Sequence, residues 1–366
     1  NILNNNGESA QVTKGNRLAF QGDRHFEYDD RGNLIREKRG KGGQLTTEFE
    51  YNDQNQLTKV TKGKQETAYQ YDPLGRRISK KDNFGETRFL WNGNQLLSES
   101  RGEINKTYLF EPGGFRPLAF VQDQKVYHYH VDHLGTPQEI SNEQGEIVWS
   151  VQYRAYGNVV KKEIEQIENN LRFQGQYFDE ETGLHYNRFR YYNPTTGRFI
   201  NQDPIGLLGG MNNYQYAPNP TGWVDPFGLT CKLAKKIQEK ANKGNIREIT
   251  QGKVCEKGYH GRLTKERMLE IVREPDGVYI STEGYQNVIF AKDGDIVVFA
   301  GDKAGAFKGQ AITSYGPSGP RGESGSVIHG GSPNDSGLPI TEEMIVNGQI
   351  PTPSGGFLAP ANKIFI

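Results

Sequence analysis

Apolar and polar residues alternate in short runs along the first third of the chain. Pairs of aromatic residues, two positions apart, precede polar turns rich in Asn, Asp and Gly, and a second alternating run follows each turn. The pairs are Phe26/Tyr28, Phe49/Tyr51 and Tyr69/Tyr71. A period of two is typical of a strand with one buried face, so two runs joined by turn residues predict a β-hairpin.

The predicted hairpin is repeated. Copies of the pattern place an aromatic residue at Tyr28, Tyr51, Tyr71 and Trp91, at intervals of 23, 20 and 20 positions. One hairpin cannot bury its apolar face alone, so successive hairpins must join into an extended sheet. Residues 1–126 are therefore expected to form a mostly β wall.

The composition agrees with this class and excludes others. The chain has 366 residues, of which 45 are Gly and 40 are Tyr, Phe or Trp, and this composition favours strands and tight turns. At this length a single core stops growing, so two or more structural units are expected. The net charge is zero, which favours neither nucleic acid nor membrane as a partner. No apolar run approaches the roughly 18 residues of a membrane helix.

The cysteines and the first residues of the chain indicate neither a disulfide framework nor a signal peptide. Cys231 and Cys255 have no neighbouring ligand pattern and are expected to be free thiols. The first residues lack an initiator Met and the apolar stretch of a signal peptide, so we expect the tail of a longer polypeptide.

Tyrosine–aspartate repeats of this kind resemble those of Rhs and YD-repeat proteins. Residues 127–137 (YHYHVDHLGTP) resemble the Rhs core signature, which residues 188–194 and 197–200 continue. The resemblance covers residues 20–229. It implies a hollow β-cocoon, of which this chain forms part of the wall, with an Rhs core over residues 127–229.

Two histidines in this signature raise the question of a metal. His128 and His130 alternate and so face the same side of a strand. No carboxylate or Cys pattern completes a ligand set, so we expect structural side chains in an aromatic wall and no metal.

A near duplication follows, Asp-Pro-Ile-Gly-Leu at 203–207 and Asp-Pro-Phe-Gly-Leu at 225–229. Pro after each Asp and Gly two positions further predict tight turns that bring the two carboxylates together. Two adjacent carboxyl groups cannot both ionise easily, so one pKa rises and a proton is shared. Such a pair can activate water against a peptide carbonyl. The residues alone leave simple turn chemistry equally open.

The resemblance to Rhs proteins implies self-cleavage just after the second copy. Asp203 and Asp225 would be the catalytic carboxylates and Leu229–Thr230 the bond that is cut. Arg198 is the candidate helper, because a nearby guanidinium can hold one carboxylate ionised. A surface salt bridge is an equally open interpretation of Arg198.

The chain changes character after Leu229. Residues 230–273 hold 12 basic and 5 acidic side chains, whereas residues 274–366 hold 5 basic and 10 acidic ones. Leu233, Ile237 and Ala241 predict a helix that Gly244 ends, and Thr264 is expected to cap a second helix. Strands are predicted at 277–281, 287–291, 295–300 and 310–315. Residues 230–366 are therefore expected to form a small α+β domain.

The Rhs resemblance implies that this domain is a toxin, usually an enzyme, released to act inside a competing cell. Residues 258–262 (GYHGR) and 277–282 (GVYIST) resemble the NAD-binding half of ADP-ribosyltransferases. Cleavage of the nicotinamide bond develops positive charge on a ribose, which requires a nearby carboxylate. The resemblance implies that NAD is the substrate. His260 or Arg262 would bind its adenosine side and Tyr279 would stack on the nicotinamide. Ser281 and Thr282 would support the wall that Tyr279 forms.

The carboxylate has three candidates. Glu342 and Glu343 are preferred because an acid followed by an apolar strand resembles the final motif of that family, and Glu323 is the third. The long loop over 316–339 departs from the family's spacing. Ordinary structural roles stay open: a core histidine for His260, a packed aromatic for Tyr279 and a solvated helix-start residue for Glu342.

Two other functions stay open for the domain. A metal-independent ribonuclease would use His260 and His329 as proton carriers, with Arg321 or Lys292 on the phosphate. A non-enzymatic structural or adhesive tail is the other. The resemblance further implies a secreted protein, a cognate immunity protein, a type VI or contact-dependent secretion apparatus, and a toxin that acts on a protein or RNA in the recipient cytoplasm.

Overall fold

The structure is a computed structural model, and it describes residues 9–112, 114–206, 212–217, 220–222, 224–229, 232–242, 263–316, 339–350 and 356–365. The chain divides into two compact units, Asn1–Thr230 and Cys231–Ile366. Among the described residues, no helix is both long and apolar enough to cross a bilayer.

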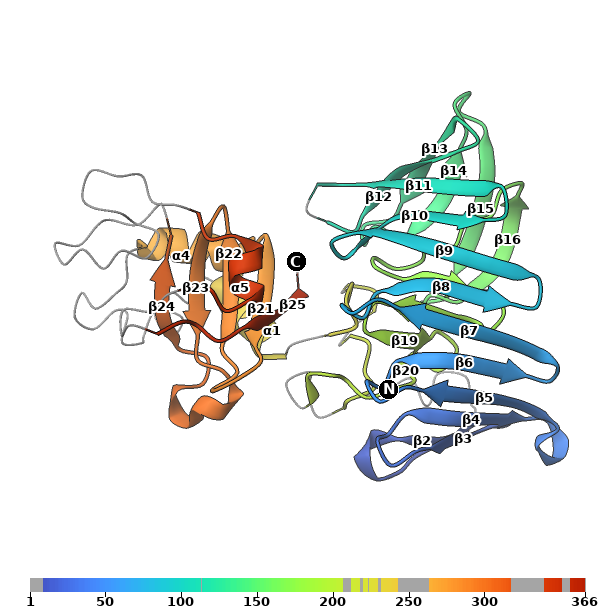
Figure 1. The fold of residues 1–366 in the computed structure, drawn as a ribbon, viewed down its shortest axis with the longest axis horizontal. Helices are drawn as coiled ribbons and strands as arrows, with labels where there is room; N and C mark the ends of the chain where they lie inside the picture. Colours follow the sequence, from blue (N-terminus) through green and yellow to red (C-terminus); the bar gives the residue numbers. More distant parts are fainter. Residues whose placement is uncertain are drawn as a thin grey trace. The chain divides into compact units, whose positions relative to one another are not determined.

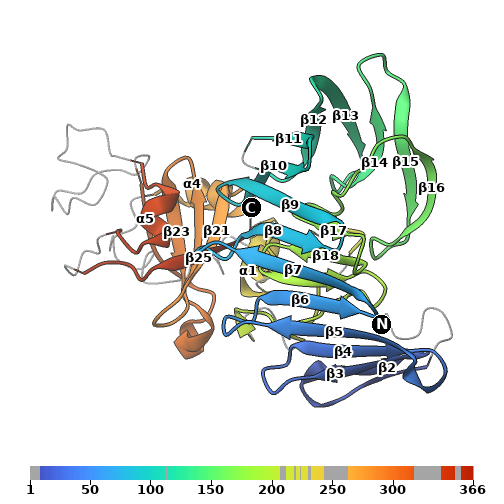
Figure 2. The same cartoon turned by 45° about the vertical axis from the view of Figure 1, so that its right-hand side comes forward.

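The first unit is built on an antiparallel sheet of 16 strands that lie in chain order, each paired with the next (Figures 1 and 2). The strands are β1 (Ala10–Val12), β2 (Leu18–Gln21), β3 (Arg24–Tyr28), β4 (Leu34–Arg39), β5 (Leu45–Tyr51), β6 (Leu57–Lys62), β7 (Gln65–Tyr71), β8 (Arg77–Asp82), β9 (Gly85–Asn92), β10 (Gln95–Arg101), β11 (Ile104–Phe110), β12 (Pro117–Gln122), β13 (Lys125–Val131), β14 (Pro137–Ser141), β15 (Ile147–Tyr153) and β16 (Val159–Glu165). The predicted mostly β wall is confirmed. We refer to this sheet as the shell sheet.

The turns of the repeat explain why an acidic or amide residue follows each tyrosine. The side chains of Asp29, Asn52 and Asp72 each accept the backbone N–H of the residue four positions on, at 2.7 to 3.0 Å. Asp132 and Asn142 make the same bond, so the repeat continues beyond the copies that the aromatic spacing indicated. The Trp91 copy differs, because Asn92 pairs directly with Gln95 across a shorter turn.

One face of the shell sheet packs on a four-stranded antiparallel sheet, which we call the small sheet. Its strands are β17 (Tyr177–Asp179), β18 (Leu184–Asn187), β19 (Arg190–Asn193) and β20 (Arg198–Phe199). The contact is largely aromatic, with ring pairs Tyr69–Tyr191, Phe89–Tyr177 and Trp91–Tyr186 at 5.1 to 6.0 Å between centroids. Arg77 and Asp179, both fully buried, join the two sheets by hydrogen bonds of 2.6 and 3.0 Å.

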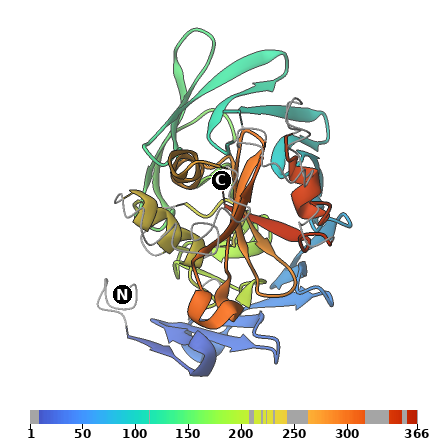
Figure 3. The ribbon, with the colours of Figure 1, turned by 90° about the vertical axis from the view of Figure 1, so that its left-hand side faces the viewer.

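The second unit has helices on both faces of a five-stranded antiparallel sheet of order β24-β23-β22-β21-β25 (Figure 3). Its elements are α1 (Lys232–Asn242), α4 (Lys265–Arg273), β21 (Gly277–Ser281), β22 (Val288–Lys292), β23 (Asp295–Phe299), β24 (Ala311–Tyr315), α5 (Glu342–Val346) and β25 (Ala361–Phe365). Helix α4 buries four apolar side chains and packs on β22 and β23, whereas α5 packs on the face that holds Tyr279.

Most predicted elements of this unit correspond to observed ones within one residue. Thr264 caps α4 as expected, accepting the backbone N–H of Arg267 at 3.2 Å. One prediction was wrong: the apolar segment after Glu342 and Glu343 belongs to the short helix α5 and is not a strand. Thr341 caps this helix by accepting the N–H of Met344, and the last strand of the sheet is β25 instead.

Candidate self-cleavage site

Both copies of the duplicated sequence form tight turns, as their Asp, Pro and Gly residues predict. In the first copy the carbonyl of Asp203 accepts the N–H of Gly206 at 2.8 Å, and its side chain accepts the N–H of Ile205 at 3.1 Å. In the second copy the carbonyl of Asp225 accepts the N–H of Gly228 at 3.2 Å. The glycines have φ of +59° and +68°, a region that favours glycine.

A single arginine from β19 joins the two acids. One guanidinium nitrogen of Arg190, Nη2, lies 3.1 Å from Oδ2 of Asp203 and 3.5 Å from Oδ2 of Asp225. Nη1 donates to the carbonyl of Asn213 at 3.1 Å, and Nε donates to the carbonyl of Gly228. All three charged side chains are buried, so the charges interact with little screening by water.

The environment of Asp203 suits proton transfer near neutral pH. The pKa of Asp203 is raised to about 6: burial raises it most, the Arg190 charge opposes the rise, and the Asp225 charge adds to it. Burial also lowers the pKa of the Arg190 guanidinium, which both carboxylates oppose. A carboxyl group with a pKa near the working pH can serve as a general acid or base.

The segment before the expected cleavage point is held on several sides. Oδ1 of Asp225 accepts the N–H of Leu229 at 2.8 Å, so the second acid lies beside the residue that precedes the bond. Asn187 donates its amide to the carbonyl of Asp225 at 2.9 Å, and the N–H of Phe189 donates to the carbonyl of Phe227 at 3.2 Å. Thr230, on the other side of the bond, lies outside the described residues.

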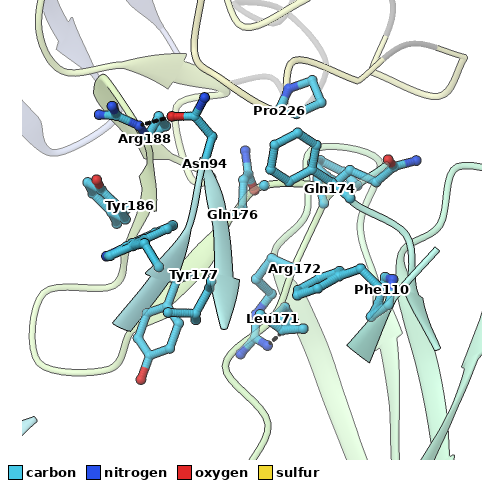
Figure 4. Close-up of a pocket in the computed structure, with 16 residues that line it drawn as sticks. Asn94, Phe110, Leu171, Arg172, Gln174, Gln176, Tyr177, Tyr186, Arg188 and Pro226 are labelled. Carbon is cyan, nitrogen blue, oxygen red and sulfur yellow. Dashed lines mark hydrogen bonds between the residues drawn. The ribbon is translucent and has the colours of Figure 1, made fainter. Parts of the chain in front are cut away.

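Phe115 and Gly175 also pack closely against this segment. The ring of Phe227 is buried edge-on against Phe115, with centroids 5.2 Å apart. Gly175 approaches the carbonyl of Pro226 so closely that a Cβ there would collide with it. A cavity of about 30 Å³ remains beside Pro226, and Arg188 and Asn94 also line it (Figure 4). That volume suffices for roughly one or two water molecules.

The predicted helper, Arg198, lies elsewhere. Its guanidinium donates to the carbonyl of Asn16 and to Oδ1 of Asn212, the latter at 3.3 Å, and it lies 5.5 Å from the ring centre of Tyr214. Sequence reasoning missed Arg190, although a signal was available. An arginine directly before two aromatic residues of a buried strand needs an anionic partner, because an unpaired buried charge is costly.

The residues predicted to bind NAD lie partly in the second unit's described region. Tyr279 on β21 and Glu342 at the start of α5 come together beside Lys363 on β25. Nζ of Lys363 lies 2.9 Å from Oε2 of Glu342 and 5.7 Å from the centre of the Tyr279 ring. Burial, and then the adjacent Glu342 carboxylate, raise the pKa of Tyr279 well above its usual value.

Ser281 and Thr282, the predicted supports of the nicotinamide wall, bind the nearby backbone. Ser281 donates to the carbonyl of Glu283 and accepts the N–H of Asn287, and Thr282 donates to the carbonyl of Pro360. Both hydroxyls therefore stabilise the chain around the end of β21. Glu343 follows Glu342 in α5 and is exposed, and Nζ of Lys292 donates to the carbonyl of Glu274 at 2.9 Å. The other five candidates lie outside the described residues: His260, Arg262, Glu323, Arg321 and His329.

The histidines considered for a metal serve the shell sheet. Nε2 of His130 lies 2.9 Å from Oγ of Ser141 on the neighbouring strand. Over the residues that the structure describes, no three His, Cys, Asp or Glu side chains gather as a metal site would require.

The shell sheet and its turns define a known class of protein. A family described as Teneurin YD-shell matches residues 1–221, and the chain belongs to this family. The predicted resemblance to YD-repeat proteins is thereby confirmed. The matched region ends before the second unit begins at Cys231.

Several known proteins are similar in sequence to this chain. Double-stranded DNA deaminase toxin A of Burkholderia cenocepacia is 42% identical over 263 residues, which cover 62% of this chain and 18% of that protein. Toxin protein Tse5 of Pseudomonas aeruginosa is 34% identical and covers 62% and 20%. Probable deoxyribonuclease RhsB of Dickeya dadantii is 33% identical and covers 66% and 18%. The chain thus spans about a fifth of the length of these relatives.

Proposed function

We propose that this chain is the C-terminal part of an Rhs polymorphic toxin and that it cuts itself between Leu229 and Thr230. The observation that carries the proposal is the buried cluster in which Arg190 joins Asp203 and Asp225 beside Leu229. The named relatives support the wider role, since two of them are called toxins. In this role residues 230–366 are the released domain.

The reaction is hydrolysis of one peptide bond. Asp225, as a carboxylate, takes a proton from a water molecule whose oxygen attacks the carbonyl carbon of Leu229. Asp203, as the acid, gives its proton to the nitrogen of Thr230 as the C–N bond breaks. The products are a carboxylic acid at Leu229 and an amine at Thr230, which then exchange a proton to become a carboxylate and an ammonium group. A proton passing from Asp225 to Asp203 restores the pair.

Arg190 has two functions in this reaction. Its charge lies next to both acids, which stabilises the ionised member of the pair at each stage. Its bond to the carbonyl of Gly228 holds the peptide directly before Leu229. A fixed segment shortens the search for the reactive geometry.

The test is the appearance of the two fragments. The chain is expected to yield fragments 1–229 and 230–366, the second with Thr230 at its N-terminus by mass spectrometry. Asp203→Asn and Asp225→Asn should each leave the chain intact. The control is Asp132→Asn, which keeps the acceptor of a shell turn and should be cut like the parent chain. Cleavage at the same bond in the double Asn variant would reject the mechanism.

We further propose that the released domain is an enzyme that acts in the cytoplasm of a recipient cell, with ADP-ribosyl transfer from NAD as the first candidate. This is supported by the proximity of Tyr279, Glu342 and Lys363, which places a carboxylate beside the aromatic ring assigned to nicotinamide. A cognate immunity protein and a secretion apparatus are the partners that this role requires.

Nucleic acid is the second candidate substrate. Two relatives are named as a DNA deaminase toxin and a deoxyribonuclease, which favours nucleic-acid chemistry, and His260 with His329 would supply it here. The two candidate activities are distinguished by incubating the released domain with labelled NAD and lysate, and separately with total RNA in the absence of metal. Transfer of label supports the first candidate, and RNA fragments support the second.

A further inference from the structure

The turn between β18 and β19 carries residues that hold the cleavage segment. Asn187 and Phe189 bind the carbonyls of Asp225 and Phe227, and Arg190 binds the carbonyl of Gly228. Arg188 lies in the middle of this turn and contacts none of those carbonyls among the described hydrogen bonds. Its side chain binds the shell sheet instead.

Arg188 binds the shell sheet. Nη2 and Nη1 donate to the carbonyls of Leu74 and Gly75, at 2.7 and 2.8 Å, in the turn between β7 and β8. Nε donates to Oδ1 of Asn94, at 2.9 Å, in the turn between β9 and β10 (Figure 4). The residue is only 6% exposed, so these acceptors replace the water that the guanidinium gives up.

The backbone at Arg188 is in an unusual conformation. Its φ is +54°, in the left-handed region that residues other than glycine rarely adopt. This conformation lets the side chain of Arg188 reach the shell sheet while the side chain of Asn187 and the backbone N–H of Phe189 bind the cleavage segment. The Phe189 ring itself lies against the Arg188 guanidinium, 4.1 Å from ring centre to Cζ. Such backbone strain persists only where the surroundings impose it, and it concentrates at functional sites.

We propose that Arg188 is a positioning residue that makes self-cleavage depend on the folded shell, a proposal that rests on the proposed self-cleavage function. Two turns of the YD repeat supply the acceptors that fix the β18–β19 turn. That turn then places Arg190 and the carbonyls of the cleavage segment. A chain whose strands β7 to β10 have not formed lacks these acceptors, so it remains uncut.

The physical basis is the cost of leaving the guanidinium unpaired. Without the carbonyls of Leu74 and Gly75, the buried donors of Arg188 would have to return to water, and the turn would move with them. A displacement of about 1 Å at a reacting group can cost on the order of 100-fold in rate. Arg190 and both acids would still be present, but misplaced.

The experiment measures the self-cleavage rate of the full chain by pulse labelling and gel electrophoresis. Arg188→Gly removes the guanidinium and suits the positive φ, so its backbone remains compatible with the fold. It should slow cleavage by about 10- to 100-fold while the thermal unfolding of the first unit is retained. Arg188→Lys, which can still donate to one of the two carbonyls, should restore part of the rate.

Two further variants make the outcome decisive. Asn94→Ala removes one acceptor from a turn of the shell sheet and should slow cleavage by roughly threefold, even if Arg188→Gly failed to fold. The matched control is Arg76→Ala: Arg76 also links these two turns, through Asp72 and the carbonyl of Gly93, but does not reach the β18–β19 turn. Its cleavage rate should equal that of the parent chain.

The results distinguish this proposal from the proposed function. If Asp203→Asn and Asp225→Asn stop cleavage while Asn94→Ala and a folded Arg188→Gly are cut at the parent rate, the role of Arg188 is rejected and self-cleavage stands. If the Asn variants of the two acids are still cut, the self-cleavage mechanism itself is rejected. Equal slowing in Arg76→Ala and Arg188→Gly would show a general effect on the shell and overturn the positioning role.

Discussion

At the scale of single residues, the proposed self-cleavage site is an arrangement of buried charges around one cation. Arg190 offers the same nitrogen to Asp203 and Asp225, and none of the three side chains is more than 6% exposed. If both carboxylates were ionised, they and the single guanidinium would carry a net negative charge in a buried site that water hardly reaches. The site relieves this by favouring the protonated form of Asp203, whose pKa is raised to about 6.

This pKa makes stability depend on pH. Between pH of about 4 and about 6, the native state holds a proton at Asp203 that the unfolded chain has released, because the ordinary pKa is 3.8. The free energy of unfolding therefore falls as the pH rises through this window, by on the order of 3 kcal/mol. Urea unfolding of the uncut Asp225→Asn chain at several pH values measures the slope, which should be smaller there because this variant lacks the Asp225 charge that also raises the pKa. Adding Asp203→Asn should flatten it, and an unchanged slope would contradict the assignment.

The two glycines of the duplicated turns differ in what surrounds them. A Cβ at Gly228 would lie 2.8 Å from the carbonyl oxygen of Asn187, whereas a Cβ at Gly206 would meet no atom of the described residues within 4 Å. Both have positive φ, so both Ala variants carry the same kind of backbone strain. Gly228→Ala should slow cleavage by at least about tenfold, because it also displaces the segment from Asn187. Gly206→Ala is the matched control, and equal rates for the two would reject the steric argument.

At the scale of elements, the turns of the repeat have a second function beyond joining strands. Their backbone carbonyls accept side chains from the rest of the first unit: Gly32 from Tyr214 at 2.7 Å, Leu134 from Gln174 at 2.8 Å, and Leu74 with Gly75 from Arg188. Several turns of the repeat thus present similar acceptors. Segments far apart in the chain are placed by binding these turns.

The second unit has its own example of an element that places a side chain. Helix α5 puts the Glu342 carboxylate beside Tyr279 and Lys363, although Glu342 and the next residue, Glu343, are both exposed. If the domain transfers ADP-ribose, Glu342→Gln should lower the transfer of label from NAD by about 100-fold, since the carboxylate meets the charge on the ribose. Glu343→Gln is the matched control and should retain activity. Comparable loss in both variants would assign the effect to folding of α5.

At the scale of the whole molecule, the division into two units falls at the bond between Thr230 and Cys231, one residue from the proposed cleavage point. Each unit has its own apolar core, the first around the shell and small sheets and the second around β21 to β25. Each core can therefore be formed without the other. Separate cores suit a protein that releases its last part.

Separate cores also predict separate unfolding. Calorimetry of the uncut Asp203→Asn chain should show two transitions, because domains generally unfold as units. One of the two should coincide with the transition of the purified fragment 230–366. A single transition in the uncut chain that is absent from the fragment would show that the second unit depends on the first.

The sequence by itself was enough for what depends on neighbouring residues. Alternation and turn residues predicted the hairpins, Thr264 and its apolar spacing predicted α4, and the paired Asp-Pro-Xaa-Gly turns formed as expected. The reason is physical: hydrogen bonds in turns, caps and adjacent strands are made within a few positions of the chain.

Tertiary structure decided which distant side chains meet. Arg190 and Arg198 lie on neighbouring strands of the small sheet, and only its packing places the first between the two acids. The same holds for α5, where the Thr341 cap favours a helix over the predicted strand, and for Arg188, whose acceptors lie more than 90 positions away. Burial, which penalises every unpaired charge, selects these partners from the whole molecule.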